Sequence, residues 1–219
     1  MGAADQAQAA SNAVAAGRRG RPPGTSARQL ELISLRLFTE DGFEETTVEQ
    51  IAATAGVSRR TFFRYFESKA DVLWHAFDGE VGALRAAFAA VAPDLALMEA
   101  IRQVVIGVNR YRAEDVPELR TRMNLIGSVP ALQASAAHHY DDWERAVSEF
   151  AAGRLGQAAG DLYPLAIGRA TLAVCRSAYD QWADRADADL TIYLDEALRA
   201  LAAGFDRDRL TGIARPVPG

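Results

Sequence analysis

The sequence predicts an all-α protein, with an amino-terminal three-helix helix-turn-helix domain at residues 25–70 and a larger helical domain at residues 71–206. Apolar residues recur three or four positions apart along most of the chain, and no segment shows the apolar–polar alternation of a half-buried strand. The stretch Thr47–Lys69 (TVEQIAATAGVSRRTFFRYFESK) also contains the caps and breaks expected of two short helices joined by a tight turn.

Composition excludes several classes of protein. The chain has 219 residues, a formal net charge of −5 and a single cysteine, Cys175, so an internal disulfide and a multi-cysteine metal site are excluded. His138 and His139 are neighbours and point about 100° apart on a helix, so they do not chelate one metal easily. Charges interrupt the apolar segments, so we expect no membrane span and no membrane partner. Without a secretory signal, we expect a cytoplasmic protein that needs no metal or other cofactor.

The positive charge lies in the amino-terminal third of the chain. Residues 18–74 hold nine Lys/Arg and eight Asp/Glu, a net charge of +1, whereas the chain from His75 onward holds fifteen and twenty, a net charge of −5. A polyanion would therefore dock on the first third. Residues 1–24 are rich in Ala, Gly and Gln and end in GRRGRPPG, which predicts a disordered basic arm; it either contacts DNA or is a solvated linker.

Three helices are expected within residues 25–70. The first runs from about residue 26 to residue 41. The second starts at Thr47, which has capping-box spacing to Gln50, and ends at Gly56, which suits a left-handed residue. The third is capped by Ser58 and runs from Arg59 to about Phe66. It buries two phenylalanines and directs outward four residues that suit a DNA major groove: Arg59, Arg60, Phe63 and Arg64.

Six further helices are expected in the larger domain. Ser68 is expected to cap the first, which runs to about Ala90 and links the domains, with a relay through Trp74, His75 and Phe77. Proline and glycine residues delimit the others, at about residues 95–112, 117–129, 131–155, 161–183 and 190–205. We expect a flexible tail at residues 207–219.

The helix at residues 161–183 is apolar around nearly its whole circumference, so it must be covered on both sides. Together with the last helix it is the expected dimer interface. The candidate dimerisation residues are Leu165, Gly168, Leu172, Cys175, Tyr179, Leu194 and Leu198.

Candidate ligand-binding residues are polar and aromatic side chains that interrupt the apolar stripes of the preceding helices, because a ligand pocket combines apolar walls with a few polar groups. They are Asn109, Arg122, Met123, His139, Tyr140 and Trp143. A methionine or aromatic at helical spacing is, however, more often part of a core than a ligand contact. Arg122 can pair a ligand anion, but Glu118 lies four residues earlier and can satisfy it instead.

The helix-turn-helix segment, with GVSRRTFFRYFESKADVL in this place, resembles the TetR family of transcriptional regulators. The resemblance rests on about fifty residues, including Phe43, Thr47, Ile51, Ala52, Gly56, Val57, Ser58, Phe62, Phe63, Tyr65, Phe66, Lys69 and Leu73. The later run RTRMNLIGSVPALQASAAHHYDDWERAVSEFAAGRLG resembles the subgroup associated with mycofactocin gene clusters. The resemblance implies a homodimer, an operator with dyad symmetry, and release from DNA by a small-molecule effector, for which an acyl-CoA is a candidate.

The resemblance also implies roles for individual residues. Thr47, Ser58, Tyr65 and Lys69 match positions that touch phosphates. Arg59, Arg60, Phe63 and Arg64 match positions that face base edges or the adjoining backbone, and arginine is well shaped for a bidentate contact to guanine.

Three hypotheses follow. The first is a ligand-responsive repressor. The second is a DNA-binding regulator that needs no effector. The third is an all-α lipid-binding protein or enzyme with a vestigial helix-turn-helix; its closest candidate for catalysis, the acidic group Asp141, Asp142 and Glu144, is the usual solvated surface of an amphipathic helix. We therefore expect no enzymatic activity.

Overall fold

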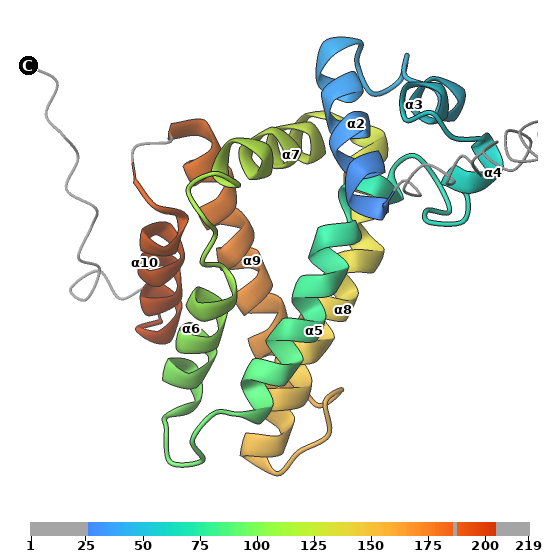
Figure 1. The fold of residues 1–219 in the computed structure, drawn as a ribbon. Coiled ribbons are helices and arrows are strands. Elements are labelled where there is room, and N and C mark those ends of the chain that lie inside the picture. Colours follow the sequence, from blue (N-terminus) through green and yellow to red (C-terminus); the bar gives the residue numbers. More distant parts are fainter. Residues whose placement is uncertain (1–25, 186–187, 205–219) are drawn as a thin grey trace, which may run out of the picture.

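The computed structural model describes residues 26–185 and 188–204. Within these ranges every regular element is a helix, which confirms the all-α fold class (Figure 1). The arm expected at residues 1–24 and the tail expected at residues 207–219 lie outside the described residues. None of the described helices is long and apolar enough to span a membrane.

The helix-turn-helix unit consists of α2 (Ala27–Glu40), α3 (Val48–Thr54) and α4 (Arg59–Phe62). A short 3-10 helix, η1 (Asp71–Leu73), leads into the larger helical part. That part comprises α5 (His75–Ala89), α6 (Leu97–Val108), α7 (Val116–Ser128), α8 (Pro130–Leu155), α9 (Leu162–Arg185) and α10 (Leu190–Ala202).

Local capping starts the helices of the helix-turn-helix unit where the sequence indicated. The Thr47 hydroxyl accepts a hydrogen bond from the Gln50 backbone N–H at 3.2 Å, and the Gln50 side chain accepts one from the Thr47 N–H at 2.7 Å, which is a complete capping box. Ser58 accepts the Thr61 N–H at 3.1 Å and so caps α4. Gly56 has φ +67°, so the turn between α3 and α4 needs a residue that tolerates a left-handed conformation.

Three expected helices differ from the structure; the one expected at residues 95–112 is α6, which spans only Leu97–Val108. The α4 helix ends at Phe62 instead of about Phe66, and the chain continues as turns in which the N–H groups of Tyr65 and Phe66 both donate to the Phe62 carbonyl. The run TFFRYF is rich in β-branched and aromatic residues, which lose rotamer freedom in a helix. The linking helix is also interrupted: Ser68 and Asp71 cap each other reciprocally and close the η1 turn, and α5 begins only at His75.

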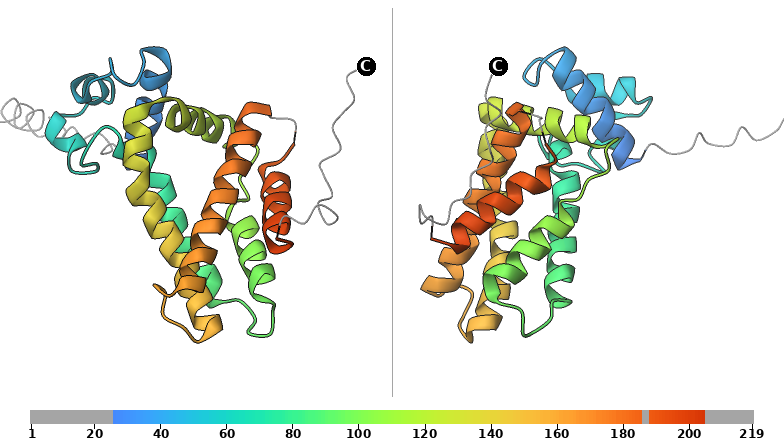
Figure 2. Two further views of the ribbon diagram at one scale, coloured as in Figure 1. Left: turned by 180° about the vertical axis from the view of Figure 1, so that it is seen from behind. Right: turned by 90° about the vertical axis from the view of Figure 1, so that its left-hand side faces the viewer.

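Two hydrophobic cores organise the molecule. The larger core joins α5, α6, α8, α9 and α10, and α8 packs along both α5 and α9 (Figures 1 and 2). The smaller core lies within the helix-turn-helix unit, around Leu30, Ile51 and Phe62. It also takes in Ile126 of α7 and Leu132 of α8. The smaller core therefore crosses from the helix-turn-helix unit into the larger helical part.

The crossing of α8 and α9 is unusually close at Gly168. A Cβ atom at this position would lie 2.1 Å from the Ser148 hydroxyl oxygen and 2.8 Å from the Glu144 carbonyl oxygen. Because no real Cβ tolerates a backbone atom at that distance, the contact depends on glycine and fixes α8 against α9.

Candidate DNA-reading surface and ligand cavity

The outward-facing residues of α4 form an exposed cationic surface. The Arg59 side chain is 64% exposed, and its ion pair with Glu49, at 3.1 Å, lies in solvent, where such pairs contribute little. Its guanidinium also stands 5.3 Å from the ring centroid of Phe63, which is 43% exposed. Arg60 is exposed as well. These side chains are therefore accessible to a DNA duplex at little cost.

Three of the residues expected to touch phosphates, Thr47, Ser58 and Tyr65, make local contacts within the chain. Thr47 and Ser58 use their hydroxyls as helix caps. The guanidinium of Arg64, an exposed residue in the turn after α4, stacks on Tyr65 at 4.9 Å and donates to the tyrosine hydroxyl at 3.1 Å.

Lys69 has a structural role that the sequence did not indicate. Its ammonium group donates to the carbonyl oxygens of Phe43 at 2.6 Å, Glu44 at 3.1 Å and Thr46 at 3.0 Å, and it lies 4.3 Å from the Phe43 ring centroid. A lysine ammonium has three hydrogens, and all three are used here. In this structure Lys69 therefore ties the loop before α3 to the start of η1 and has no hydrogen left for a phosphate.

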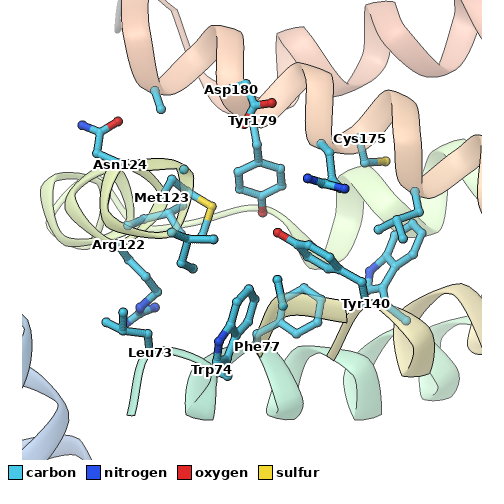
Figure 3. A pocket seen from close by; sticks show the side chains of 18 of the residues that line it. Leu73, Trp74, Phe77, Arg122, Met123, Asn124, Tyr140, Cys175, Tyr179 and Asp180 are labelled. Atoms are coloured by element: carbon cyan, nitrogen blue, oxygen red, sulfur yellow. The ribbon is translucent and has the colours of Figure 1, made fainter. Parts of the chain in front are cut away.

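A cavity of about 860 Å³ lies in the larger helical part, with α5, α6, α7, α8 and α9 contributing to its walls (Figure 3). Trp74 and Phe77 rise from the α5 side, while Tyr140 of α8 and Tyr179 of α9 face each other across it. Five of the six expected ligand residues line this cavity: Asn109, Arg122, Met123, Tyr140 and Trp143. The sixth, His139, is not among the lining residues; its ring stacks on Trp74, with centroids 4.7 Å apart and planes 12° apart.

One wall of the cavity carries a chain of polar groups. Glu80 of α5 is linked to the Tyr111 hydroxyl at 2.7 Å, and this hydroxyl lies 3.1 Å from that of Tyr179. Tyr179 donates to the side-chain oxygen of Asn109, whose amide donates to the Val105 carbonyl at 2.7 Å. Four side chains from α5, α9 and the α6–α7 region therefore form one continuous hydrogen-bonded wall.

The number of hydrogens in this chain depends on the protonation state of Glu80. Three contacts join Glu80, Tyr111, Tyr179 and Asn109 in series, and the Tyr111 hydroxyl also lies 3.4 Å from the Asn109 side-chain oxygen, but the two tyrosines supply only two hydroxyl hydrogens. An ionised Glu80 leaves one contact without a hydrogen, whereas a protonated Glu80 supplies the third. Burial raises the pKa of the Glu80 carboxyl, while the Tyr111 hydrogen bond and the charge of Arg122 oppose this rise. Burial also raises the pKa of both tyrosines, so they stay protonated.

Arg122 reaches out of the cavity wall into an ion network at the junction with the helix-turn-helix unit. Its guanidinium donates to Glu31 of α2 and, at 2.8 Å, to Glu118 of α7. Arg28 of α2 holds both Glu118 oxygens, at 2.6 and 2.5 Å, and contacts Glu31 at 3.2 Å. The pairing with Glu118 was one of the two expectations for Arg122; Glu31 is the additional partner.

Several important residues were missed by sequence reasoning. Glu80 and Tyr111 stand on segments with no distinguishing motif. Glu31 gave a usable signal, because an acid one turn before Ser34 and two turns before Phe38 stands on the apolar stripe of the first helix, where it must find a buried partner.

The expected dimerisation residues require a correction. Gly168, Cys175, Leu194 and Leu198 are buried within the protomer, so these positions are not available to a second copy. Leu172, Cys175 and Tyr179 line the cavity, and Leu165 is half-buried. Much of α9 is covered inside one chain by α8, α10 and the cavity wall, while positions such as Ala166, Arg169 and Ala173 stay exposed.

Cys175 behaves as a core thiol, as its apolar neighbours indicated. It is buried, and burial raises its pKa to about 12, so it is not a ready nucleophile. Across residues 26–185 and 188–204, no three His, Cys, Asp or Glu side chains come together as a metal-binding group.

Two family models match the chain. Residues 34–75 match the model for bacterial regulatory proteins of the tetR family, and residues 95–206 match the model for the MftR C-terminal domain. Together they cover the exposed cationic surface of α4 and nearly all of the cavity walls.

Full-length relatives agree with these matches. The chain is 30% identical over 190 residues to a Mycobacterium tuberculosis protein that bears the name mycofactocin biosynthesis transcriptional regulator MftR, covering 87% of this chain and 96% of that protein. It is 31% identical over 202 residues to the transcriptional regulator TcmR of Streptomyces glaucescens, covering 84% and 89% of the two chains.

Solved structures show the same fold. FadR of Thermus thermophilus, a TetR-family repressor in complex with lauroyl-CoA, matches with a TM-score of 0.56 and 22% identity over 89% of this chain and 100% of that one. SmeT of Stenotrophomonas maltophilia, in complex with triclosan, matches with a TM-score of 0.57 and 21% identity over the same shares. With a family model covering half of its length and full-length relatives at 30% identity, this chain belongs to the TetR family of bacterial transcriptional regulators.

Proposed function

We propose that this regulator is a ligand-responsive repressor, which binds an inverted-repeat operator as a homodimer and leaves it when a hydrophobic or amphipathic effector fills the cavity. The observation that carries the proposal is the cavity itself. Its volume of about 860 Å³ lies within the range of small-molecule sites, roughly 300–1,000 Å³. It stands directly beside η1 and α7, two elements that contact α2 of the helix-turn-helix unit.

The cavity lining favours an effector with a large apolar portion. Trp74, Phe77, Met123 and Trp143 provide apolar walls, while the Glu80–Tyr111–Tyr179–Asn109 chain provides one polar wall. Apolar walls with a few convergent polar groups suit an amphipathic molecule. An acyl-CoA is the candidate class to test first, because FadR of T. thermophilus was solved in complex with lauroyl-CoA.

A homodimer is proposed because one α4 helix contacts too few base pairs for useful specificity. Two such helices read one face of DNA when their half-sites are about 34–36 Å apart, or a multiple of that distance. We keep α9 and α10 as the pairing elements, but with their exposed positions, such as Ala173 and Ile192, in place of the buried ones. Ala173→Arg is expected to convert a dimer to monomers in sedimentation experiments.

A selection experiment tests DNA recognition. The full chain is used to retain fragments from a genomic library of its source organism, and the enriched duplex is then titrated in the presence of competitor DNA. We expect an inverted repeat to be enriched, and log K to fall with log salt by roughly 0.9 for each phosphate contact. Retention of fragments without a common sequence would refute specific recognition.

The effector is tested with lauroyl-CoA as the probe. We expect it to bind the free protein and to weaken binding to the enriched duplex. Leu172→Trp, which puts a larger side chain in the cavity wall, should weaken lauroyl-CoA binding, whereas Leu165→Trp on the same helix lies outside the lining and serves as the control. Duplex binding that no ligand affects would instead support the effector-independent alternative. The family membership supports a regulatory rather than a catalytic role.

A further inference from the structure

The helix-turn-helix unit and the cavity wall share one buried group of charges. Arg28 and Glu31 come from α2, and Glu118 and Arg122 come from α7; each carboxylate contacts both arginines. The inner pair is almost fully enclosed, since the side chains of Glu31 and Arg122 are 1% and 7% exposed. The outer pair reaches the surface, with Arg28 49% exposed.

Stability alone is a poor explanation for this network. Removing two charges from water costs several kcal/mol per ion, and an apolar pair of similar size is often as stable or more stable. The network is also incompletely satisfied, because the buried Nε atom of Arg122 has no hydrogen-bond partner among the residues that the structure describes. Buried ion pairs of this kind are best attested as devices that fix a register or a switch.

The position of α7 gives the network a second connection. Arg122, Met123 and Ile126 all line the cavity, so one face of α7 meets the site that the effector would fill. Ile126 also belongs to the small core of the helix-turn-helix unit. Figure 1 shows α7 lying across the end of the bundle, next to α2. A ligand that displaces α7 therefore moves the helix that forms ion pairs with α2.

The cavity and the helix-turn-helix unit are also connected through the backbone of the chain. Leu73, Trp74 and Phe77 also line the cavity and continue directly from the helix-turn-helix unit through η1 into α5. This covalent path was the relay expected from the sequence. The two paths differ in a testable way, because the ion network can be cut without altering any residue of η1 or α5.

We propose that the Arg28–Glu31–Glu118–Arg122 network couples the cavity to the DNA-reading surface, so that displacement of α7 by a bound effector is transmitted to α2. This inference rests on the proposed ligand-responsive function. It requires that cutting the network on its α2 side, outside the cavity, uncouples two binding events that each remain intact.

The test measures coupling rather than affinity. The enriched duplex is titrated with and without saturating lauroyl-CoA, and the ratio of the two dissociation constants is the coupling factor, which typically lies between 5- and 150-fold. We expect Glu31→Gln to keep both separate affinities and to bring this factor close to one. Glu40→Gln is the matched control: the same change on the same helix, at an exposed acid paired with Arg36, should leave the factor unchanged.

A second variant covers the case in which Glu31→Gln does not fold, because it alters a buried group. Arg28→Met removes the half-exposed arm of the network and is expected to lower the coupling factor severalfold. Hydrogen exchange provides an independent readout, since lauroyl-CoA should change the exchange of α2 amides in the wild type but not in the variant.

The outcomes separate this inference from the proposed function. If lauroyl-CoA and related acyl-CoAs leave duplex binding of the wild type unchanged, the ligand-responsive function fails and the coupling network fails with it. If the wild type is released but a folded network variant is released equally well, the function stands and the network is overturned. A variant that loses lauroyl-CoA affinity instead of coupling also overturns it.

Discussion

Replacing Glu80 with glutamine tests whether the hydrogen-bonded chain Glu80–Tyr111–Tyr179–Asn109 needs a neutral group at its end. A carboxyl whose pKa is raised by folding stabilises the protein fully below its unfolded pKa, about 4.3, and this contribution is lost as the pH rises through the folded pKa. At pH 8 an ionised Glu80 leaves one of three part-buried contacts without a hydrogen. One such hydrogen bond contributes about 1 kcal/mol. The glutamine amide supplies its hydrogen at every pH.

We therefore expect Glu80→Gln to melt roughly 2–4 °C above the wild type at pH 8, as about 1 kcal/mol implies for a chain of this size. The difference should shrink towards pH 4, where the wild type is protonated. Thermal melts of both proteins in matched buffers between pH 4 and pH 8 measure it, and an infrared band of a protonated carboxyl that is missing from the variant gives a direct check.

Glu99 provides a control of opposite sign. Hydrogen bonds from Arg102 and Gln103 lower the pKa of the Glu99 carboxyl to about 2, so its contribution is present at neutral pH and is lost as the pH falls towards 2. Glu99→Gln should therefore lower the melting temperature at pH 7. If Glu80→Gln behaved in the same way, with a loss at pH 8 that shrinks in acid, Glu80 would be an ionised acceptor and the reasoning from the hydrogen count would be wrong.

Three other substitutions test the DNA-reading surface and the α8–α9 crossing. Arg59→Ala should weaken duplex binding and relax sequence preference by about 1–3 kcal/mol at one base pair, measured against a set of single-base operator variants; equal loss on all duplexes would contradict a base contact. Lys69→Ala should lower the melting temperature, because three loop carbonyls lose their donor, and an unchanged melting temperature would refute the structural role. Gly168→Ala should destabilise by about 1–3 kcal/mol in denaturant unfolding, because its Cβ would overlap α8, whereas Gly153→Ala, which meets open space, should not.

The parts of the fold that could be predicted are those set by near neighbours in the sequence. The Thr47–Gln50 capping box depends on residues three apart, and the apolar stripes depend on spacings of three and four, so a single sequence contains the whole signal. The early end of α4 at Phe62 was harder to predict. Periodicity locates the buried face of a helix but does not show where its hydrogen bonding changes from helix to turn.

The parts that could not be predicted depend on partners far along the chain. An apolar circumference indicates that α9 is covered, but not whether a second copy, α8 or a cavity covers it. Tyr179 was therefore assigned to the dimer interface, whereas it lines the cavity. Arg122 and Glu31 are 91 positions apart, so only the packing of α7 on α2 brings them together. Lys69 and the carbonyl of Phe43 are 26 positions apart, and they too are brought together only by the packing of distant segments.

The small core that crosses between the two parts has a practical consequence for protein engineering. Exchanging DNA specificity between relatives by grafting residues 26–70 cuts the chain at the boundary suggested by the sequence, but leaves behind Ile126, Leu132 and Ala136, which complete that core from α7 and α8. A graft that also carries the α7–α8 corner keeps both the packing and the charges that meet α2. The unit that can be transplanted is therefore discontinuous in the sequence. A chimera that exchanges only one continuous segment would combine core residues of two different proteins that do not fit each other.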